Sequence, residues 1–171
     1  NKGRELLTEG KIALMTVAGG QGTRLGFDAP KGTYPITPVK NKSLFQYFAE
    51  TILRLNEKYD CSLNWYIMTS ILNADDTQNF FRENDFFGIP EENVFFFSQG
   101  MMPTVDYQGN LLLSSKSSVS MSPNGHGGSL LALRSSGALD RMKENGEEYI
   151  SYFQVDNPLV SVADPLFLGL H

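Results

Sequence analysis

The sequence predicts an α/β protein with a mostly parallel sheet. Apolar runs with strand character alternate with segments whose apolar residues recur at helical spacing. One run, Phe95 to Phe97, is apolar without a break, which is typical of a strand buried on both faces. Polar and glycine-rich segments follow the strands, and open α/β sheets bind ligands at the carboxyl ends of their strands. The same pattern therefore predicts the fold class and the place of a site.

Four segments have the pattern of strands of this sheet. They are short apolar runs bounded by polar or glycine residues. We expect strands over residues 12–18, 64–69, 93–98 and 148–155. A further segment, 104–114, has turn residues between apolar flanks and predicts a β-hairpin that projects from the main sheet.

Three helices are expected between the strands. Ser43 is a suitable N-cap for the first, whose apolar residues then recur at helical spacing. Asn73 can cap a second helix that ends near Asn84. A third helix is expected from Gly127 through Leu139, a segment rich in leucine.

Composition and charge argue against several classes of function. The chain has 171 residues, a formal net charge of −5 and no basic stripe, so we expect no nucleic-acid partner. No apolar run is long enough to span a bilayer and no signal peptide is visible, so we expect no membrane partner. The single cysteine, Cys61, permits no internal disulfide, favours a packing role and is typical of a reducing compartment, here the cytoplasm. Because the chain begins with Asn1, a removed targeting segment is the open alternative.

The most informative segment is the glycine-rich loop that follows the first predicted strand, Val17 to Gly26. Glycines allow a tight turn and bring backbone N–H groups close to an anion. Arg24 within the loop and Lys31 after it add two positive charges. Such a set of free amides and cations suits a polyphosphate.

Two familiar glycine-loop motifs do not fit this segment. A Walker loop needs a lysine directly after its last glycine, and a dinucleotide fingerprint needs a third glycine or alanine three residues after the second. Counted from Gly19 for the first motif and from Gly20 for the second, both positions fall on Leu25. A dehydrogenase is therefore only a distant alternative.

The loop and the Pro30-Lys31 pair together resemble the signature of the eukaryotic-type UDP-sugar pyrophosphorylases, the UDPGP family, in which Gly-Gly-x-Gly-Thr-x-Leu/Met-Gly is followed by Pro-Lys. Four further segments resemble this family, the last two most closely its UDP-N-acetylglucosamine branch: 121–128, 154–165, 65–70 and 97–103. The resemblance implies a Rossmann-like sheet of the nucleotide-diphospho-sugar transferase (GT-A-like) type with an inserted β-hairpin. Members are considerably longer, so residues 1–171 are expected to be the nucleotide-binding N-terminal part of a larger catalytic domain, inactive alone.

The resemblance implies a uridylyltransferase that forms a UDP-sugar and pyrophosphate from UTP and a sugar 1-phosphate, with N-acetylglucosamine 1-phosphate preferred. The attacking phosphate oxygen is largely ionised at neutral pH, so no general base is needed. His126 keeps the sugar open, because Gly-His-Gly resembles the UDP-glucose and broad UDP-sugar branches, whereas the following Gly127-Gly128 resembles the N-acetylglucosamine branch. A nucleotide-sugar-binding module without turnover is the alternative from another class, and the oligomeric state is left open.

Arg24 and Lys31 are the predicted catalytic residues. The planar fork of Arg24 suits the β- and γ-phosphates, which leave as pyrophosphate, and Lys31 suits the α-phosphate, where the new bond forms. The resemblance gives Lys31 the same contact with the nucleotide. The alternative is that both are solvated loop residues.

Further positions complete the predicted site. Gln99 can read the uracil edge and Gly125 lets the base approach, roles that the resemblance supports. The resemblance also places His126 beside the sugar. Asp156, at a strand end on the same side, can hold Mg²⁺ against the phosphates of the nucleotide. The alternatives are a surface glutamine, a turn glycine, a packing histidine and a turn aspartate. The loop supplies the other predicted nucleotide-binding residues: Val17, Ala18, Gly19 and Gly20.

Overall fold

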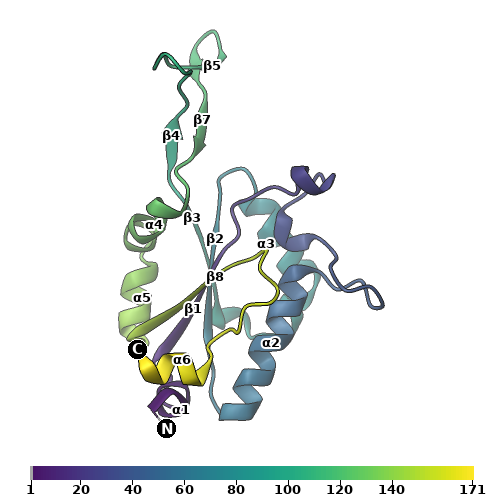
Figure 1. The fold of residues 1–171 in the computed structure, drawn as a ribbon, viewed down its shortest axis with the longest axis vertical. Helices are drawn as coiled ribbons and strands as arrows, with labels where there is room; N and C mark the ends of the chain where they lie inside the picture. The colour runs from purple at the N-terminus through teal and green to yellow at the C-terminus, as the bar shows by residue number, and fades with distance from the viewer. Residues whose placement is uncertain (1) are drawn as a thin grey trace.

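The computed structural model of the protein describes residues 2–171, apart from the side chain of Arg24. The role predicted for the Arg24 side chain therefore lies outside the described residues. Figure 1 shows a sheet with helices on both faces and a long arm that extends from the end of the sheet where the strands finish.

A parallel sheet forms the centre of the molecule. Its four strands lie in the order β3-β2-β1-β8, and each neighbouring pair is parallel. The predicted parallel α/β fold is thus confirmed, and the predicted strand positions are correct to within a residue at either end. The strands are β1 (Ile12–Val17), β2 (Asn64–Thr69), β3 (Val94–Ser98) and β8 (Tyr149–Gln154).

Helices bury the two faces of this sheet in separate apolar clusters. α2 and α3 cover one face with a cluster rich in aromatic rings, and α4 and α5 cover the other (Figure 1). α1 contacts α6 near the amino ends of the strands. The helices of the described residues are α1 (Lys2–Thr8), α2 (Leu44–Tyr59), α3 (Ala74–Glu83), α4 (Ser129–Ser135), α5 (Ala138–Glu144) and α6 (Pro165–Leu170).

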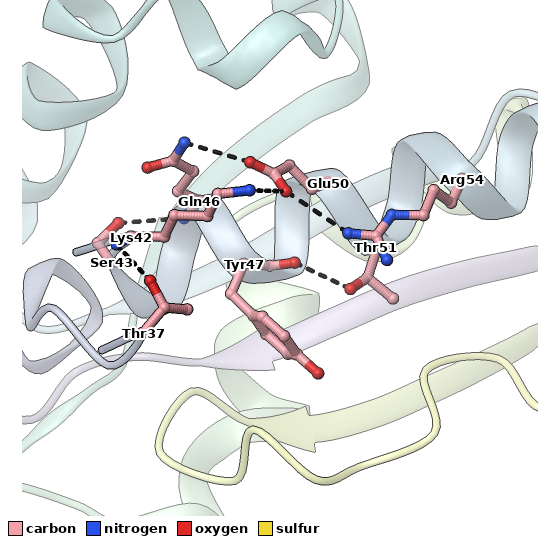
Figure 2. Close-up of polar contacts among 8 residues, drawn as sticks. All are labelled: Thr37, Lys42, Ser43, Gln46, Tyr47, Glu50, Thr51 and Arg54. Carbon is pink, nitrogen blue, oxygen red and sulfur yellow. Dashed lines mark hydrogen bonds and ion pairs between the residues drawn. The ribbon is translucent and has the colours of Figure 1, made fainter. Parts of the chain in front are cut away.

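The start of α2 is held by local polar contacts (Figure 2). The Ser43 hydroxyl accepts a hydrogen bond from the Gln46 N–H at 3.1 Å, which confirms Ser43 as the N-cap. One turn further on, the Glu50 carboxylate accepts hydrogen bonds from Lys42 and Gln46. The bond from Lys42 lowers the pKa of Glu50 below its ordinary value, although burial opposes the shift. These contacts tie the first turns of α2 to the loop before it and lie apart from the pocket described below.

The single helix predicted from Gly127 through Leu139 is wrong. The structure has a short turn, η5 (His126–Gly128), and then two helices, α4 and α5. Gly137 separates them with a φ of +80°, a left-handed conformation that ends α4 and that glycine adopts without strain. The leucine-rich pattern correctly predicts helical residues on either side of this break.

The predicted hairpin 104–114 is confirmed, because Val105 and Leu111 form an antiparallel bridge and the Leu112 N–H donates to Thr104 O at 2.9 Å. Its turn is present, since the Asp106 carboxylate accepts a hydrogen bond from the Asn110 N–H at 2.8 Å. The long arm contains further strand pairs that the sequence did not predict. β4 (Met101–Pro103) pairs with β7 (Met121–Pro123), and the short strands β5 (Leu113–Ser115) and β6 (Ser118–Val119) pair beyond them. Local turn signals could not show which distant segments pair.

Short helices lie at both ends of the described chain. The sequence predicted neither α1 nor α6, which are both short; Asp164 caps α6 by accepting a hydrogen bond from the Leu166 N–H at 2.8 Å. Cys61 is half-buried against the α2 cluster, which confirms its packing role. None of the helices in the described residues has the length and apolar character needed to cross a membrane.

Candidate functional site

A pocket of about 200 Å³ lies at the carboxyl ends of β1 and β3, beside the root of the arm. Every residue that lines it except Pro123 is a predicted site residue. The structure therefore brings together positions that are spread over more than a hundred residues of sequence. The lining residues are Val17, Gly19, Gly20, Gln99, Pro123, Gly125 and His126.

A larger cavity, of about 730 Å³, lies between β8 and α6. None of the predicted site residues lines it, and it lacks the backbone amides of the glycine loop. We therefore take the smaller pocket as the candidate site, because chemistry and not volume distinguishes the two.

The glycine loop presents unpaired amides beside this pocket. Two of its carbonyl groups are occupied, since Ala18 O accepts from the Asn73 side chain at 2.9 Å and Gly20 O accepts from the Lys31 N–H at 3.1 Å. In the part of the chain that the structure describes, the N–H groups of Gly19, Gly20 and Gln21 donate no hydrogen bond. Unpaired backbone donors are rare away from water and form a ready site for an anion.

Gln99 closes the pocket from the end of β3. Its residue is only 7% exposed, and its backbone N–H donates to Thr69 O at 2.9 Å. The side-chain amide has no hydrogen bond to any described residue, so its donor and acceptor are free for a ligand. A Cβ on Gly19 would lie 3.0 Å from Gln99 Nε2, so a larger residue there would push the amide from this place.

Lys31 and Asp156 lie next to the loop and pair with each other. Lys31 Nζ donates to Asp156 Oδ2 at 2.8 Å. The hydrogen bond from Lys31 lowers the pKa of Asp156 and keeps the carboxylate charged, against a smaller opposing effect of burial. Lys31 Nζ lies 3.7 Å from the place that a Cβ would take on Gly20. Both charges are therefore at the pocket, although neither residue is part of its lining.

His126 makes a contact that the sequence did not indicate. Its Nδ1 lies 2.6 Å from the hydroxyl of Tyr152 on β8, which leaves Nε2 free for a ligand. Burial raises the pKa of Tyr152, so its hydroxyl stays protonated at neutral pH. Gly125, just before, has a φ of +68° and a ψ of −165°, a conformation that essentially only glycine adopts.

Asn73 is the second residue that the sequence did not assign to the site. Asn73 holds the predicted N-cap position of α3, but its side chain makes no cap hydrogen bond to this helix. It instead donates to the carbonyls of Ala18 and Gly20 in the glycine loop. No sequence signal separates this role from capping, which is the common role of asparagine before a helix.

The described residues contain no group of three or more His, Cys, Asp and Glu side chains placed to hold a metal ion. Asp156 supplies one carboxylate beside the glycine loop. Mg²⁺ in nucleotide sites is usually held by one or two protein carboxylates together with phosphate oxygens and water. The residues thus fit an ion that binds with a phosphate ligand and do not form an all-protein metal site.

Comparison with known proteins identifies the family. Residues 1–171 match the family model UDPGP, described as UTP--glucose-1-phosphate uridylyltransferase, and the chain belongs to this family. It is 40% identical to UDP-N-acetylglucosamine diphosphorylase 2 of Arabidopsis thaliana, over 98% of this chain and 36% of the relative. It is 42% identical to UDP-N-acetylhexosamine pyrophosphorylase-like protein 1 of Mus musculus, over 93% of this chain and 32% of the relative. The chain thus spans about a third of the length of the curated relatives that it matches.

A solved structure extends the likeness to the fold. The uridine diphosphate N-acetylglucosamine pyrophosphorylase of Trypanosoma brucei, in complex with an inhibitor, superposes with a TM-score of 0.91 at 33% identity. The match covers 98% of this chain and 36% of that chain. A UDP-glucose pyrophosphorylase structure of Leishmania major, at 20% identity and a TM-score of 0.77, shares the fold alone.

Proposed function

We propose that residues 1–171 form the nucleotide-binding N-terminal part of a larger catalytic domain, which converts UTP and a sugar 1-phosphate into a UDP-sugar and pyrophosphate. The observation that carries the proposal is the convergence of six predicted site residues on one pocket, with Lys31 and Asp156 beside it. The names of the relatives favour N-acetylglucosamine 1-phosphate as the sugar substrate. We further propose a cytoplasmic location, in line with the unpaired Cys61.

The chemistry needs alignment more than proton transfer. An oxygen of the sugar phosphate attacks the α-phosphorus of UTP, the bond from that phosphorus to the bridging oxygen breaks, and pyrophosphate leaves. Because the attacking oxygen is already ionised at neutral pH, no general base is required. The site must then hold the two phosphates in line and balance their charge. This requirement matches a pocket that offers backbone amides, has Lys31 beside it and has no serine, threonine or cysteine in its lining.

Lys31 is the proposed α-phosphate contact, and Arg24 the proposed contact of the departing pyrophosphate. The free amides of the glycine loop add neutral donors to the same phosphates. A phosphate that binds Lys31 competes with Asp156 for the ammonium group. Once released, the Asp156 carboxylate would hold Mg²⁺, which balances the phosphate charge when it is bound.

The base and the sugar are proposed to contact different residues of the same pocket. The free side-chain amide of Gln99 offers a donor and an acceptor to the uracil edge, and the open backbone at Gly125 lets the base approach. His126 is the proposed sugar contact, through the Nε2 that its bond with Tyr152 leaves free.

One observation favours a second candidate, a UDP-glucose or broad-specificity UDP-sugar pyrophosphorylase. The pocket has the imidazole of His126, held by Tyr152, at the position proposed to face the sugar. A free imidazole nitrogen can hydrogen-bond a hydroxyl group, and hydroxyl groups are common to many hexoses, so His126 fits a broader range of sugars.

The decisive experiment uses the full-length protein with UTP, Mg²⁺ and a panel of sugar 1-phosphates, including N-acetylglucosamine, glucose and galactose 1-phosphate. We expect pyrophosphate release that is fastest with N-acetylglucosamine 1-phosphate and much slower when CTP replaces UTP. Residues 1–171 alone should show little or no turnover. Tight binding of a UDP-sugar without any pyrophosphate release would indicate a binding module and contradict the proposal.

A further inference from the structure

We propose that Asn73 is a positioning residue, which turns two backbone amides of the glycine loop toward the triphosphate of the nucleotide. The proposal rests on the proposed function, because it requires a nucleoside triphosphate at this pocket. It adds a residue from outside the loop that sets how the loop meets its ligand.

The side chain of Asn73 is held in one orientation by its acceptor end. Asn73 is 1% exposed, and its Oδ1 accepts from the Ser70 N–H at 2.8 Å and from the Ser70 hydroxyl at 3.0 Å. Because both of these donors engage Oδ1, the amide nitrogen must face the other way. A flip of the amide would bring Nδ2 against the Ser70 N–H, two donors in a buried place, which is costly.

The donor end reaches the glycine loop. Asn73 Nδ2 donates to Ala18 O at 2.9 Å and to Gly20 O at 3.4 Å. A trans peptide is planar, with its C=O and the following N–H on opposite sides. The bond to Ala18 O therefore points the Gly19 N–H away from Asn73, and the bond to Gly20 O does the same for the Gln21 N–H.

These two amides are among the three in the loop that lack partners. Neither donates a hydrogen bond within the described residues, and Gly19 lines the pocket. The glycines of the loop do not fix the orientation of its peptides by themselves, because glycine has the widest range of allowed backbone conformations. Ala18 O has no other donor among the described residues, whereas Gly20 O also accepts from the Lys31 N–H. Loss of the Asn73 amide would thus free the Ala18–Gly19 peptide first.

The test replaces Asn73 with aspartate in the full-length protein. Asn73→Asp keeps the shape and the acceptor for Ser70 but turns the donor into an acceptor that repels the two loop carbonyls. We expect kcat/KM for UTP to fall by about tenfold to 100-fold, because misplaced contacts to a reacting group have effects of this size. KM for UTP should rise while KM for the sugar 1-phosphate stays unchanged. A residue that only stabilised the fold would change neither KM selectively.

Asn64→Asp is the matched control. Asn64 is the first residue of β2, the strand that precedes Asn73, and its side chain donates to Glu147 at 2.9 Å, so this variant also replaces an amide donor with a charge. It should lower the melting temperature and leave KM for UTP unchanged. If Asn73→Asp does not fold, Asn73→Ala, which adds no charge, gives the same comparison.

The outcomes separate the two proposals. Unchanged KM for UTP in both folded Asn73 variants, with an active wild type, would overturn the positioning role alone. A wild-type protein that neither binds UTP nor releases pyrophosphate would overturn the proposed function, and the positioning role with it. A selective rise in KM for UTP, absent from Asn64→Asp, supports both.

Discussion

Two lysine–carboxylate ion pairs link the β1 and β8 segments, one at each end of these neighbouring strands, and the two pairs have nearly the same N–O distance. At the amino ends of these strands, Lys11 Nζ lies 2.7 Å from Glu148; beyond their carboxyl ends, Lys31 Nζ lies 2.8 Å from Asp156. The hydrogen bond between Lys11 and Glu148 raises the pKa of Lys11 and lowers that of Glu148, as Lys31 lowers that of Asp156. By geometry alone, neither pair is marked as functional.

Their surroundings differ. Beside the first pair, backbone groups are hydrogen-bonded to each other, since the Lys11 carbonyl accepts from the N–H groups of Glu148 and Tyr149. Around Lys31, three loop amides and the Gln99 side chain have no partner in the described part of the chain. Unpaired polar groups at a pocket carry a cost to folding that a ligand can offset. A binding site is therefore indicated by the unpaired polar groups around an ion pair and not by the ion pair itself.

The largest expected difference between the two ion pairs is the effect of removing each lysine on activity. We predict that Lys31→Ala lowers kcat of the full-length protein by about 100-fold or more, as the loss of one charge contact to a reacting centre does elsewhere. Lys11→Ala should leave kcat unchanged, with a thermal melting curve like that of Lys31→Ala. Pyrophosphate release is the assay. Equal activities of the two variants would show that Lys31 is as structural as Lys11.

The carboxylates give a second, smaller contrast. Asp156→Asn keeps the shape of the side chain but removes the charge proposed to hold Mg²⁺. We predict a lower maximal rate and an increase of about tenfold in the Mg²⁺ concentration for half-maximal activity, because Mg²⁺ usually has only one or two protein carboxylates as ligands and this variant removes one. Glu148→Gln is the control and should give the wild-type curve. Initial rates in a Mg²⁺ titration measure both. Superimposable curves for all three proteins would identify Asp156 as a turn residue.

The sugar side of the pocket is tested through Tyr152. We predict that Tyr152→Phe raises KM for the sugar 1-phosphate by about fivefold, the equivalent of a net hydrogen bond of about 1 kcal/mol that fixes His126. KM for UTP should not change. Tyr149→Phe, on the same strand, is the control because its hydroxyl bonds no described residue. A rise in both Michaelis constants of Tyr152→Phe would mean that the tyrosine supports the whole pocket.

The smallest expected effect lies at the amino end of β2, in a closed polar cluster. The half-buried Glu147 carboxylate accepts from Tyr66 at 2.7 Å and from Asn64 at 2.9 Å. Burial raises the pKa of Glu147 despite these bonds and the nearby Arg141. The folded state therefore binds a proton more tightly than the unfolded chain, so this group's contribution to stability is present below the ordinary carboxyl pKa of about 4.3 and is lost as pH rises through the raised value.

We predict that Glu147→Gln removes this pH dependence. The difference in unfolding free energy between wild type and variant should shift in favour of the variant as pH rises from about 4.5 to 7. Urea unfolding at a series of pH values measures this difference, and activity should not change. A shift in favour of the wild type would mean that the hydrogen bonds, and not burial, dominate the pKa of Glu147.

Much of the pocket could be predicted because its residues lie in continuous motifs. Val17, Gly19 and Gly20 follow a strand directly, and Gln99 and Gly125 also sit in short loops after or before regular elements. Such positions follow from local pattern, since a strand that ends in a parallel sheet delivers its next residues to the carboxyl edge. The helix break at Gly137 escaped prediction, because the leucine pattern continues through it.

Pairings between distant residues could not be predicted. The contact from Asn73 to Ala18 spans 55 positions, and that from His126 to Tyr152 spans 26. Asparagine before a helix and tyrosine in a strand each have a common local role, which the sequence alone favours. The long arm is a similar case, because β4 and β7 enclose a segment with turn signals of its own.

The parallel α/β core and the glycine loop follow from the amino-acid sequence, because strand and helix periodicity and backbone freedom are properties of neighbouring residues. Which polar groups are paired and which are left free depends instead on how distant segments meet in the fold. Lys31 and Asp156 are 125 positions apart and meet because β1 and β8 are neighbours in the sheet. The Gly19 and Gln21 amides face away from Asn73 because this residue, in the turn after β2, donates to the carbonyls of Ala18 and Gly20. Hydrogen-bond satisfaction depends on the order of strands in space, which no local pattern contains.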